Sequence, residues 1–150
     1  MRRRLAVIAI PLAAVASLSL ASVATAAPFG LSATSLRGAN EVPGPGDDDG
    51  AGRAIASPRA GQGQMCISIR YRGIDAPTGA HIHEGPPDVA GPVVIDFTPL
   101  IATSPAGQIR GCVDADPALV ADVAENPFEY YVNVHNVAFP AGAIRGQLRG

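Results

Sequence analysis

Lysine and tryptophan are absent from this sequence of 150 residues, which holds two cysteines and three histidines. We attribute the missing lysines, like the abundance of alanine, glycine and proline, to genome composition rather than to function. No stretch after Leu20 is apolar enough to cross a membrane. No serine lies in a nucleophile-elbow motif, which argues against a hydrolase of that type. Internal repeats are missing as well, and nothing in the pattern indicates a second domain.

The N-terminus has the three parts of a secretory signal peptide. Three arginines follow Met1, an apolar run covers residues 5–20, and residues 24–26 form an Ala-Thr-Ala cleavage site. The apolar run of 16 residues is shorter than the roughly 20 that span a bilayer, which favours cleavage over an uncleaved anchor. Residues 1–26 are therefore predicted to be a signal peptide. Residues 27–150 are predicted to be a single domain, either secreted and extracellular or held in the cell envelope.

The charge balance after removal of this peptide is acidic. The remaining chain keeps eight arginines against 13 acidic residues, a net charge of −5. Such a balance disfavours nonspecific binding to nucleic acid or to anionic membrane surfaces. We therefore expect no nucleic-acid partner, and a partner that is an unidentified protein or envelope ligand.

The two cysteines lie in segments that alternate between apolar and polar residues. Cys112 shares the polar face of its segment with Gln108 and Arg110, and Cys66 lies opposite the apolar positions of its own segment. An even number of cysteines in an exported chain indicates a disulfide. We predict that Cys66 and Cys112 bridge neighbouring strands across the outer surface of a sheet. A thiol metal site or a reactive thiol is the alternative.

Most of the chain is typical of short strands separated by glycine and proline. Eight segments fit this pattern: Leu31–Arg37, Gly52–Ser57, Gln64–Arg72, Gly79–Glu84, Pro92–Phe97, Gln108–Val113, Phe128–His135 and Ala143–Leu148. One segment instead predicts a short crossover helix, because Asp116 can cap it, Pro117 suits its first position and Pro127 stops it. The predicted fold is all-β, an antiparallel sandwich or barrel of about eight strands with one short helix.

The only histidines of the chain, His81, His83 and His135, lie in two of these strands. Side chains two apart on a strand point to the same side, so His81 and His83 project together. The side chain of His135 points away from those of two valines in its own segment, which we assign to the core. All three histidines are therefore expected on the outer face of the sheet, together with Asn133. Arg145, in the last strand, is expected to point to the same outer face.

Four segments in order resemble the CHRD domain, a family named after chordin and widespread in exported bacterial proteins. They are Leu31-Ser-Ala-Thr-Ser-Leu-Arg-Gly-Ala-Asn-Glu-Val-Pro43, Ala80-His-Ile-His-Glu-Gly85, Tyr131-Val-Asn-Val-His135 and Phe139-Pro-Ala-Gly-Ala-Ile-Arg-Gly-Gln-Leu148. The resemblance extends over nearly all of the chain that follows the signal peptide. It implies an immunoglobulin-like β-sandwich, in agreement with the strand pattern, and it implies little about activity.

A second resemblance concerns the histidines alone. The segment His81-Ile82-His83-Glu84 is similar to the His-x-His-Glu strand of copper–zinc superoxide dismutase, another β-sandwich, whose metals lie outside the barrel. That enzyme needs more histidines for its two metals than the three present here, which excludes a complete copper–zinc centre. A single copper or zinc ion held by His81, His83 and His135 is compatible with the count, since imidazole suits both metals. The side chain of Glu84 is expected to point to the other face of the strand, which makes it a poor fourth ligand.

Two functions are consistent with these patterns. The preferred one is a small exported CHRD-domain protein that acts as a noncatalytic binding or structural module. The histidines would then form a hydrogen-bonded polar network with Asn133 and Arg145, or bind a ligand other than a metal. The alternative is a mononuclear copper- or zinc-binding protein with minor redox activity. We assign no catalytic residue, and no cofactor other than the copper or zinc of this alternative.

Overall fold

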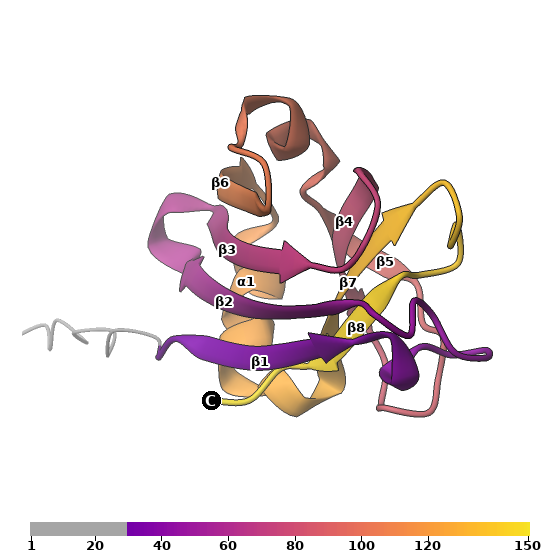
Figure 1. The fold of residues 1–150 in the computed structure, drawn as a ribbon. Coiled ribbons are helices and arrows are strands. Elements are labelled where there is room, and N and C mark those ends of the chain that lie inside the picture. The colour runs from indigo at the N-terminus through magenta and orange to yellow at the C-terminus, as the bar shows by residue number, and fades with distance from the viewer. Residues whose placement is uncertain (1–29) are drawn as a thin grey trace, which may run out of the picture.

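Eight antiparallel strands form one continuous sheet in the computed structural model, which describes residues 30–150. The strands are β1 (Ser32–Arg37), β2 (Ala51–Arg59), β3 (Gln64–Arg72), β4 (Pro77–Glu84), β5 (Val93–Asp96), β6 (Gln108–Asp114), β7 (Tyr130–Asn136) and β8 (Ile144–Gln147). Their order is β5-β4-β7-β8-β1-β2-β3-β6, and the sheet curls into an incompletely closed barrel (Figure 1). The predicted all-β fold is confirmed. The predicted signal peptide lies outside the described residues.

The barrel interior is filled by the apolar positions of the alternating strands. Side chains from seven strands are fully buried there: Leu36, Ala54, Ile69, Ile82, Ile109, Val132 and Ile144. A short 3-10 helix, Thr98–Thr103, connects β5 to β6, and its Leu100 packs against the core. A Cβ at Gly111 of β6 would lie 2.8 Å from Leu100 Cδ2, so glycine makes room for this contact.

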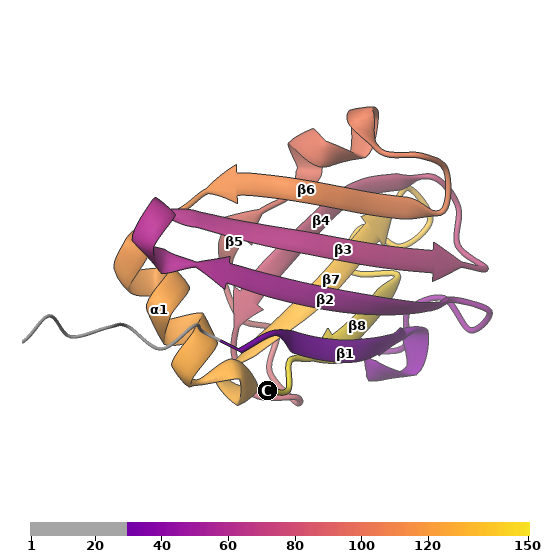
Figure 2. The same cartoon turned by 90° about the vertical axis from the view of Figure 1, so that its left-hand side faces the viewer.

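The crossover helix α1 (Pro117–Glu125) connects β6 to β7 and covers one end of the barrel (Figure 2). The Asp116 carboxylate accepts hydrogen bonds from the backbone N–H groups of residues 118 and 119, which caps the helix. Val120 and Val123 are fully buried against the barrel core. The helix predicted from Asp116 and Pro117 is thus confirmed. No helix within the described part of the chain is long and apolar enough to span a membrane.

The two cysteines form the predicted disulfide. Cys66 of β3 lies directly opposite Cys112 of β6, with Cα atoms 3.9 Å apart. Both project from the outer face, as their parity indicates, although Cys66 is largely covered by its neighbours. The disulfide joins the edge strand β6 to the rest of the sheet.

Strand boundaries differ from the predicted ones by one or two residues at several ends. The largest differences, of two residues, are at β2, which continues to Arg59, at β4, which begins at Pro77, and at β7, which begins at Tyr130. β7 begins later because Pro127 opens a short 3-10 turn in which Phe128 is 61% exposed. The apolar Phe128 thus lies in the turn before β7 and not in the strand.

Candidate metal centre

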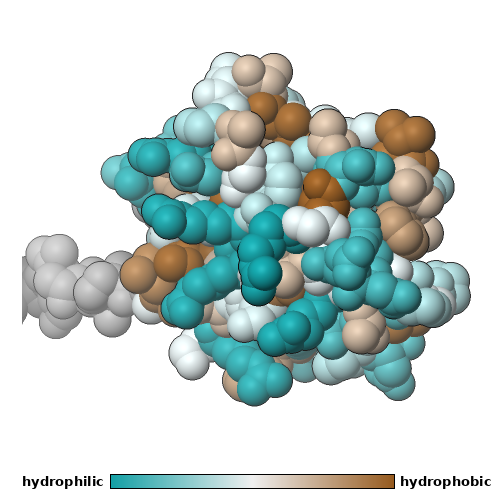
Figure 3. All heavy atoms as spheres, in the orientation of Figure 1, coloured by the Kyte–Doolittle hydropathy of each residue, from teal (hydrophilic) through white to brown (hydrophobic). Residues whose placement is uncertain are grey.

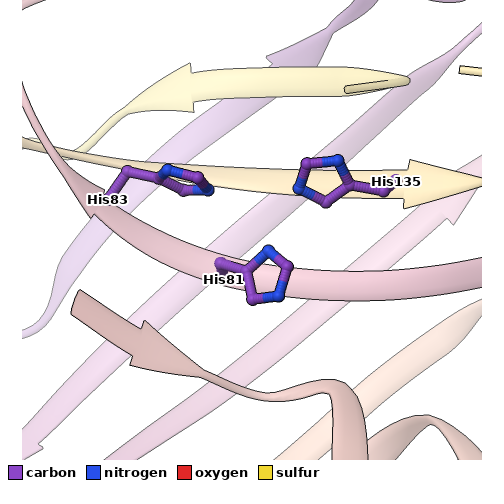
Figure 4. A group of neighbouring side chains, drawn as sticks. All are labelled: His81, His83 and His135. Carbon is purple, nitrogen blue, oxygen red and sulfur yellow. The ribbon is translucent and has the colours of Figure 1, made fainter. Parts of the chain in front are cut away.

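β4 and β7 bring the three histidines together on the outer wall of the barrel (Figure 4). The two strands pair in a register that sets Gly79 opposite His135, His81 opposite Asn133 and His83 opposite Tyr131. The residues between them, such as Ile82 and Val134, point into the core. The period of two therefore places the histidines outside, and the register between the two strands places them next to one another.

The three imidazole rings lie close enough to share one ligand. Their centroids are 4.9 Å apart for His81 and His135, 5.5 Å for His81 and His83, and 6.1 Å for His83 and His135. One ring nitrogen of each histidine lies within 4.8 Å of the other two. Gly79 makes room for this packing, because a Cβ there would lie 3.0 Å from His81 Cε1 and 3.5 Å from His135 Cδ2.

Each ring is held in place by polar contacts at the nitrogen that faces away from the cluster. His83 Nδ1 donates to the Gly91 carbonyl at 2.9 Å, and His135 Nδ1 donates to the Pro140 carbonyl at 3.0 Å. His81 Nε2 lies 3.3 Å from the Asp96 carboxylate and 3.3 Å from the Thr98 hydroxyl. Since carbonyl oxygens only accept hydrogen bonds, Nδ1 of His83 and Nδ1 of His135 carry the proton of a neutral ring. The Thr98 hydroxyl can donate or accept, and the nearby Asp96 carboxylate favours the tautomer of His81 with the proton on Nε2.

The remaining ring nitrogens are His81 Nδ1, His83 Nε2 and His135 Nε2. All three are buried and have no hydrogen-bond partner among the described residues. In the tautomers set by the outer hydrogen bonds, each of them presents a lone pair. Burial lowers the pKa of all three histidines, with a further lowering of the pKa of His81 and His83 by the neighbouring His135. The cluster therefore presents three neutral imidazoles with free lone pairs.

An arginine and a tyrosine stack beside the cluster. The ring of Tyr131 is stacked on His83 at 4.7 Å between centroids, with an angle of 10° between the ring planes. The guanidinium carbon of Arg145 lies 3.4 Å from the centroid of Tyr131, a cation–π contact. Arg145 also donates from Nη2 to the carbonyls of Pro86 and Val89, both at 2.9 Å. The β4–β5 loop is thereby fixed above β7 and β8.

Asn133 is hydrogen-bonded to a buried carboxyl group. Its Nδ2 donates to both carboxyl oxygens of Glu41, at 2.9 and 2.8 Å. Burial raises the pKa of Glu41 to about 8, against the lowering effects of Arg145 and of the Asn133 hydrogen bond. Glu41 is therefore mostly protonated at neutral pH. The side chain of Asn133 thus donates to Glu41, and that of Arg145 donates to backbone carbonyls.

Several residues of the site had no signal in the sequence. Asp96, Thr98 and Gly91 support the histidines from β5 and its flanking loops, and Glu41 supports Asn133 from a loop after β1. The alternation of β5 sets Asp96 outward, but only the β4–β5 register places it opposite His81. Glu84, the weak fourth candidate, is exposed and lies outside the cluster.

Comparison with known proteins assigns the chain to a family. The family model described as the CHRD domain matches residues 32–148, which includes all three histidines and both cysteines. No curated protein and no solved structure is significantly similar to the chain.

Proposed function

The chain belongs to the CHRD domain family, and we propose that it is an extracellular binding module of this family that holds one copper or zinc ion through His81, His83 and His135. The family suggests an extracellular binding module without specifying its ligand. The histidine cluster supplies the chemistry that the family leaves open.

One observation carries the proposal. Three buried nitrogen lone pairs lie next to one another without a hydrogen-bond donor in the described chain. Unpaired buried polar atoms are rare and costly, and here they are all of one kind. A cation between them would satisfy all three. The hydrogen bonds from the outer nitrogens match the usual support of metal-bound histidines by carbonyl or carboxylate groups.

The geometry requires a small rearrangement on binding. In a tetrahedral site with metal–nitrogen bonds of about 2.0 Å, the ligand nitrogens are about 3.3 Å apart. The nitrogens here lie within 4.8 Å, so small rotations of the rings would close the site. Three imidazoles leave a fourth position for water or for a group of a bound partner. Imidazole suits both copper and zinc, and we propose either metal for this reason.

We also propose that the protein is exported to an oxidising compartment. The proposed signal peptide, residues 1–26, lies outside the described residues. The Cys66–Cys112 disulfide and the CHRD domain are both consistent with a secreted or extracellular protein. We therefore propose that the mature chain, 27–150, is a single exported domain.

Metal analysis of tag-free protein tests the function. We expect one equivalent of zinc or copper to remain after loading and dialysis, measured by mass spectrometry of the intact protein and by elemental analysis. His83→Ala should abolish this equivalent because it removes one of three ligands. Glu84→Gln, a change on the next residue that lies outside the cluster, should retain it. The proposal is refuted if, after loading, the protein retains no stoichiometric metal and its melting temperature is unchanged. The cluster would then be a polar network.

A further inference from the structure

The outer faces of β1, β2, β3 and β6 carry an excess of positive charge. These strands hold six of the eight arginines in residues 30–150, against a single acidic residue, Asp114. All six arginines alternate with core positions and are exposed: Arg37, Arg53, Arg59, Arg70, Arg72 and Arg110. We call this surface the arginine face. Hydrophilic side chains gather over β1, β2 and β3 on the side of the molecule that Figure 3 shows.

Within the arginine face, like charges are placed next to one another. Arg53 of β2 lies directly opposite Arg70 of β3, and Arg37 and Arg72 flank Ala51 in the next row. Neighbouring strands are about 4.8 Å apart, and like charges opposite one another destabilise a sheet. Within residues 30–150 the one contact at ion-pair distance is between His81 and Asp96, so none of these guanidinium groups has a carboxylate partner. A bound anion would remove this repulsion.

A groove runs along the arginine face. Its larger part has a volume of about 820 Å³ and is lined by Arg37, Arg53 and Arg149, with the buried Arg145 at one side. Two acidic residues, Asp88 and the mostly protonated Glu41, also line it, so the arginines outnumber the ionised carboxylates there. A smaller hollow of about 300 Å³ lies over β2 and β3, and it shares Ser35, Arg37 and Arg53 with the first. The two hollows therefore form one path across the strands from β8 to β3.

We propose that the groove on the arginine face, along which Arg37, Arg53, Arg70 and Arg72 lie, binds a linear acidic polysaccharide whose sugar rings carry carboxylate groups. Arginine has a planar fork of donors that matches a carboxylate in two parallel hydrogen bonds. The groove also offers hydroxyl and amide groups, from Thr34, Ser35, Asn40 and Gln147, as partners for sugar hydroxyls. Alternating charged and neutral polar groups fit a ligand in which each ring combines one carboxylate with several hydroxyls.

The charge of the whole chain favours this ligand over nucleic acid. Thirteen acidic residues outnumber the eight arginines in the described chain, and most of them lie away from the arginine face. A densely charged polyanion that extends beyond the groove would meet these carboxylates. A short run of uronic acid rings would contact the groove alone. The arginine face also lies on other strands than the histidine cluster, although Arg145 lies next to both, beside Tyr131 and at one side of the groove.

Binding of a galacturonic acid hexamer to the full mature protein tests the proposal by calorimetry at about 50 mM salt, where screening is weak. We expect measurable binding that weakens as salt is added. Arg53→Gln and Arg70→Gln should each reduce the affinity about fivefold, the upper end for an exposed charge pair. Arg59→Gln makes the same charge change at the far end of β2, outside the groove, and should leave the affinity unchanged.

Three controls separate specific binding from general attraction. The hexamer with its carboxylates converted to methyl esters should not bind, and an oligonucleotide of equal charge should bind more weakly. The melting temperatures of the Arg53→Gln and Arg70→Gln proteins should not fall, since each change removes a like-charge pair. Absent binding of the hexamer, equal binding of its ester or of the oligonucleotide, or equal loss in Arg59→Gln would overturn the proposal.

Discussion

At the scale of single residues, the site depends on which nitrogen of each histidine is occupied. The Gly91 and Pro140 carbonyls and the Asp96 carboxylate take the proton-bearing nitrogens. The nitrogens left over are buried without a partner in the described residues, and each ring turns one nitrogen toward the other rings (Figure 4). The carbonyl or carboxylate next to the outer nitrogen of each histidine thus sets the tautomer in which its inner nitrogen can bind a metal. Glu41 is the other residue on this wall whose protonation differs from that of an exposed side chain.

The pKa of Glu41 predicts a pH dependence of stability. Because this pKa is raised from 4.5 to about 8, the folded protein binds a proton that the unfolded chain releases between these values. The free energy of unfolding should therefore fall as pH rises from about 4.5 to about 8. Glu41→Gln keeps a neutral amide in place of the carboxyl, and its decline over this range should be smaller.

Urea unfolding of both proteins at several pH values measures this effect. The matched control is Glu125→Gln, at an exposed carboxyl on α1, which should follow the wild-type profile. The interpretation of Glu41 as a protonated group is wrong if the Glu41→Gln protein and the wild type decline in parallel.

At the scale of secondary-structure elements, the incompletely closed barrel leaves two end strands. β5 pairs on one side with β4, and β6 pairs on one side with β3. β5 contributes Asp96 to the surroundings of the histidine cluster, so the pairing of β5 with β4 helps to hold His81 in place. β6 is joined covalently to β3 by the disulfide and is also packed by Leu100 from the connecting 3-10 helix. Exposed edges of a sheet invite pairing with other chains, and both attachments oppose this.

Removal of the disulfide is predicted to destabilise the protein without changing its fold. Cys66 and Cys112 are 46 residues apart, for which the chain-entropy model gives a loss of about 3–4 kcal/mol in the free energy of unfolding. Chemical denaturation of the Cys66→Ala/Cys112→Ala protein measures the loss. Ser68→Ala, at an exposed position of β3, should change stability by less than about 0.5 kcal/mol. Equal stability of the double variant and the wild type would contradict the role given to the disulfide.

At the scale of the whole molecule, the two proposed sites lie on different walls of one barrel. The histidine cluster is built on β4 and β7, and the arginine face on β1, β2, β3 and β6. β8 lies between the two walls, and its Arg145 touches both, through Tyr131 and through the groove. The closed packing of one core thus supports two chemically different surfaces.

Metal binding is predicted to stabilise the whole fold. A ligand present at a hundred times its dissociation constant raises the free energy of unfolding by about 2.7 kcal/mol when it binds the folded state alone. Urea unfolding with and without zinc at pH 7 should show a rise of this size, absent in His83→Ala. Because burial lowers the pKa of all three histidines, the rise should persist somewhat below pH 6.5 and then disappear as the rings become protonated. A rise that is the same in His83→Ala would place the zinc elsewhere.

The sequence by itself determined which residues face outward and where most elements lie. Alternation in β3 and β6 predicted the disulfide, Asp116 and Pro117 predicted the helix, and the spacing of His81 and His83 predicted their common face. Each of these follows from the local periods of strand and helix. Nearly the whole secondary structure was predictable for this reason, to within one or two residues at most ends.

Only the tertiary structure decided which strands are neighbours. A period of two assigns a face to a residue but gives no pairing partner and no register. The approach of Asp96 to His81, the contact of Glu41 with Asn133 and the pairing of Arg53 with Arg70 depend on strand order and register around the barrel. The outer nitrogens of the histidines acquire their partners in the same way. Closure of the core therefore turned outward-facing histidines and arginines into candidate sites.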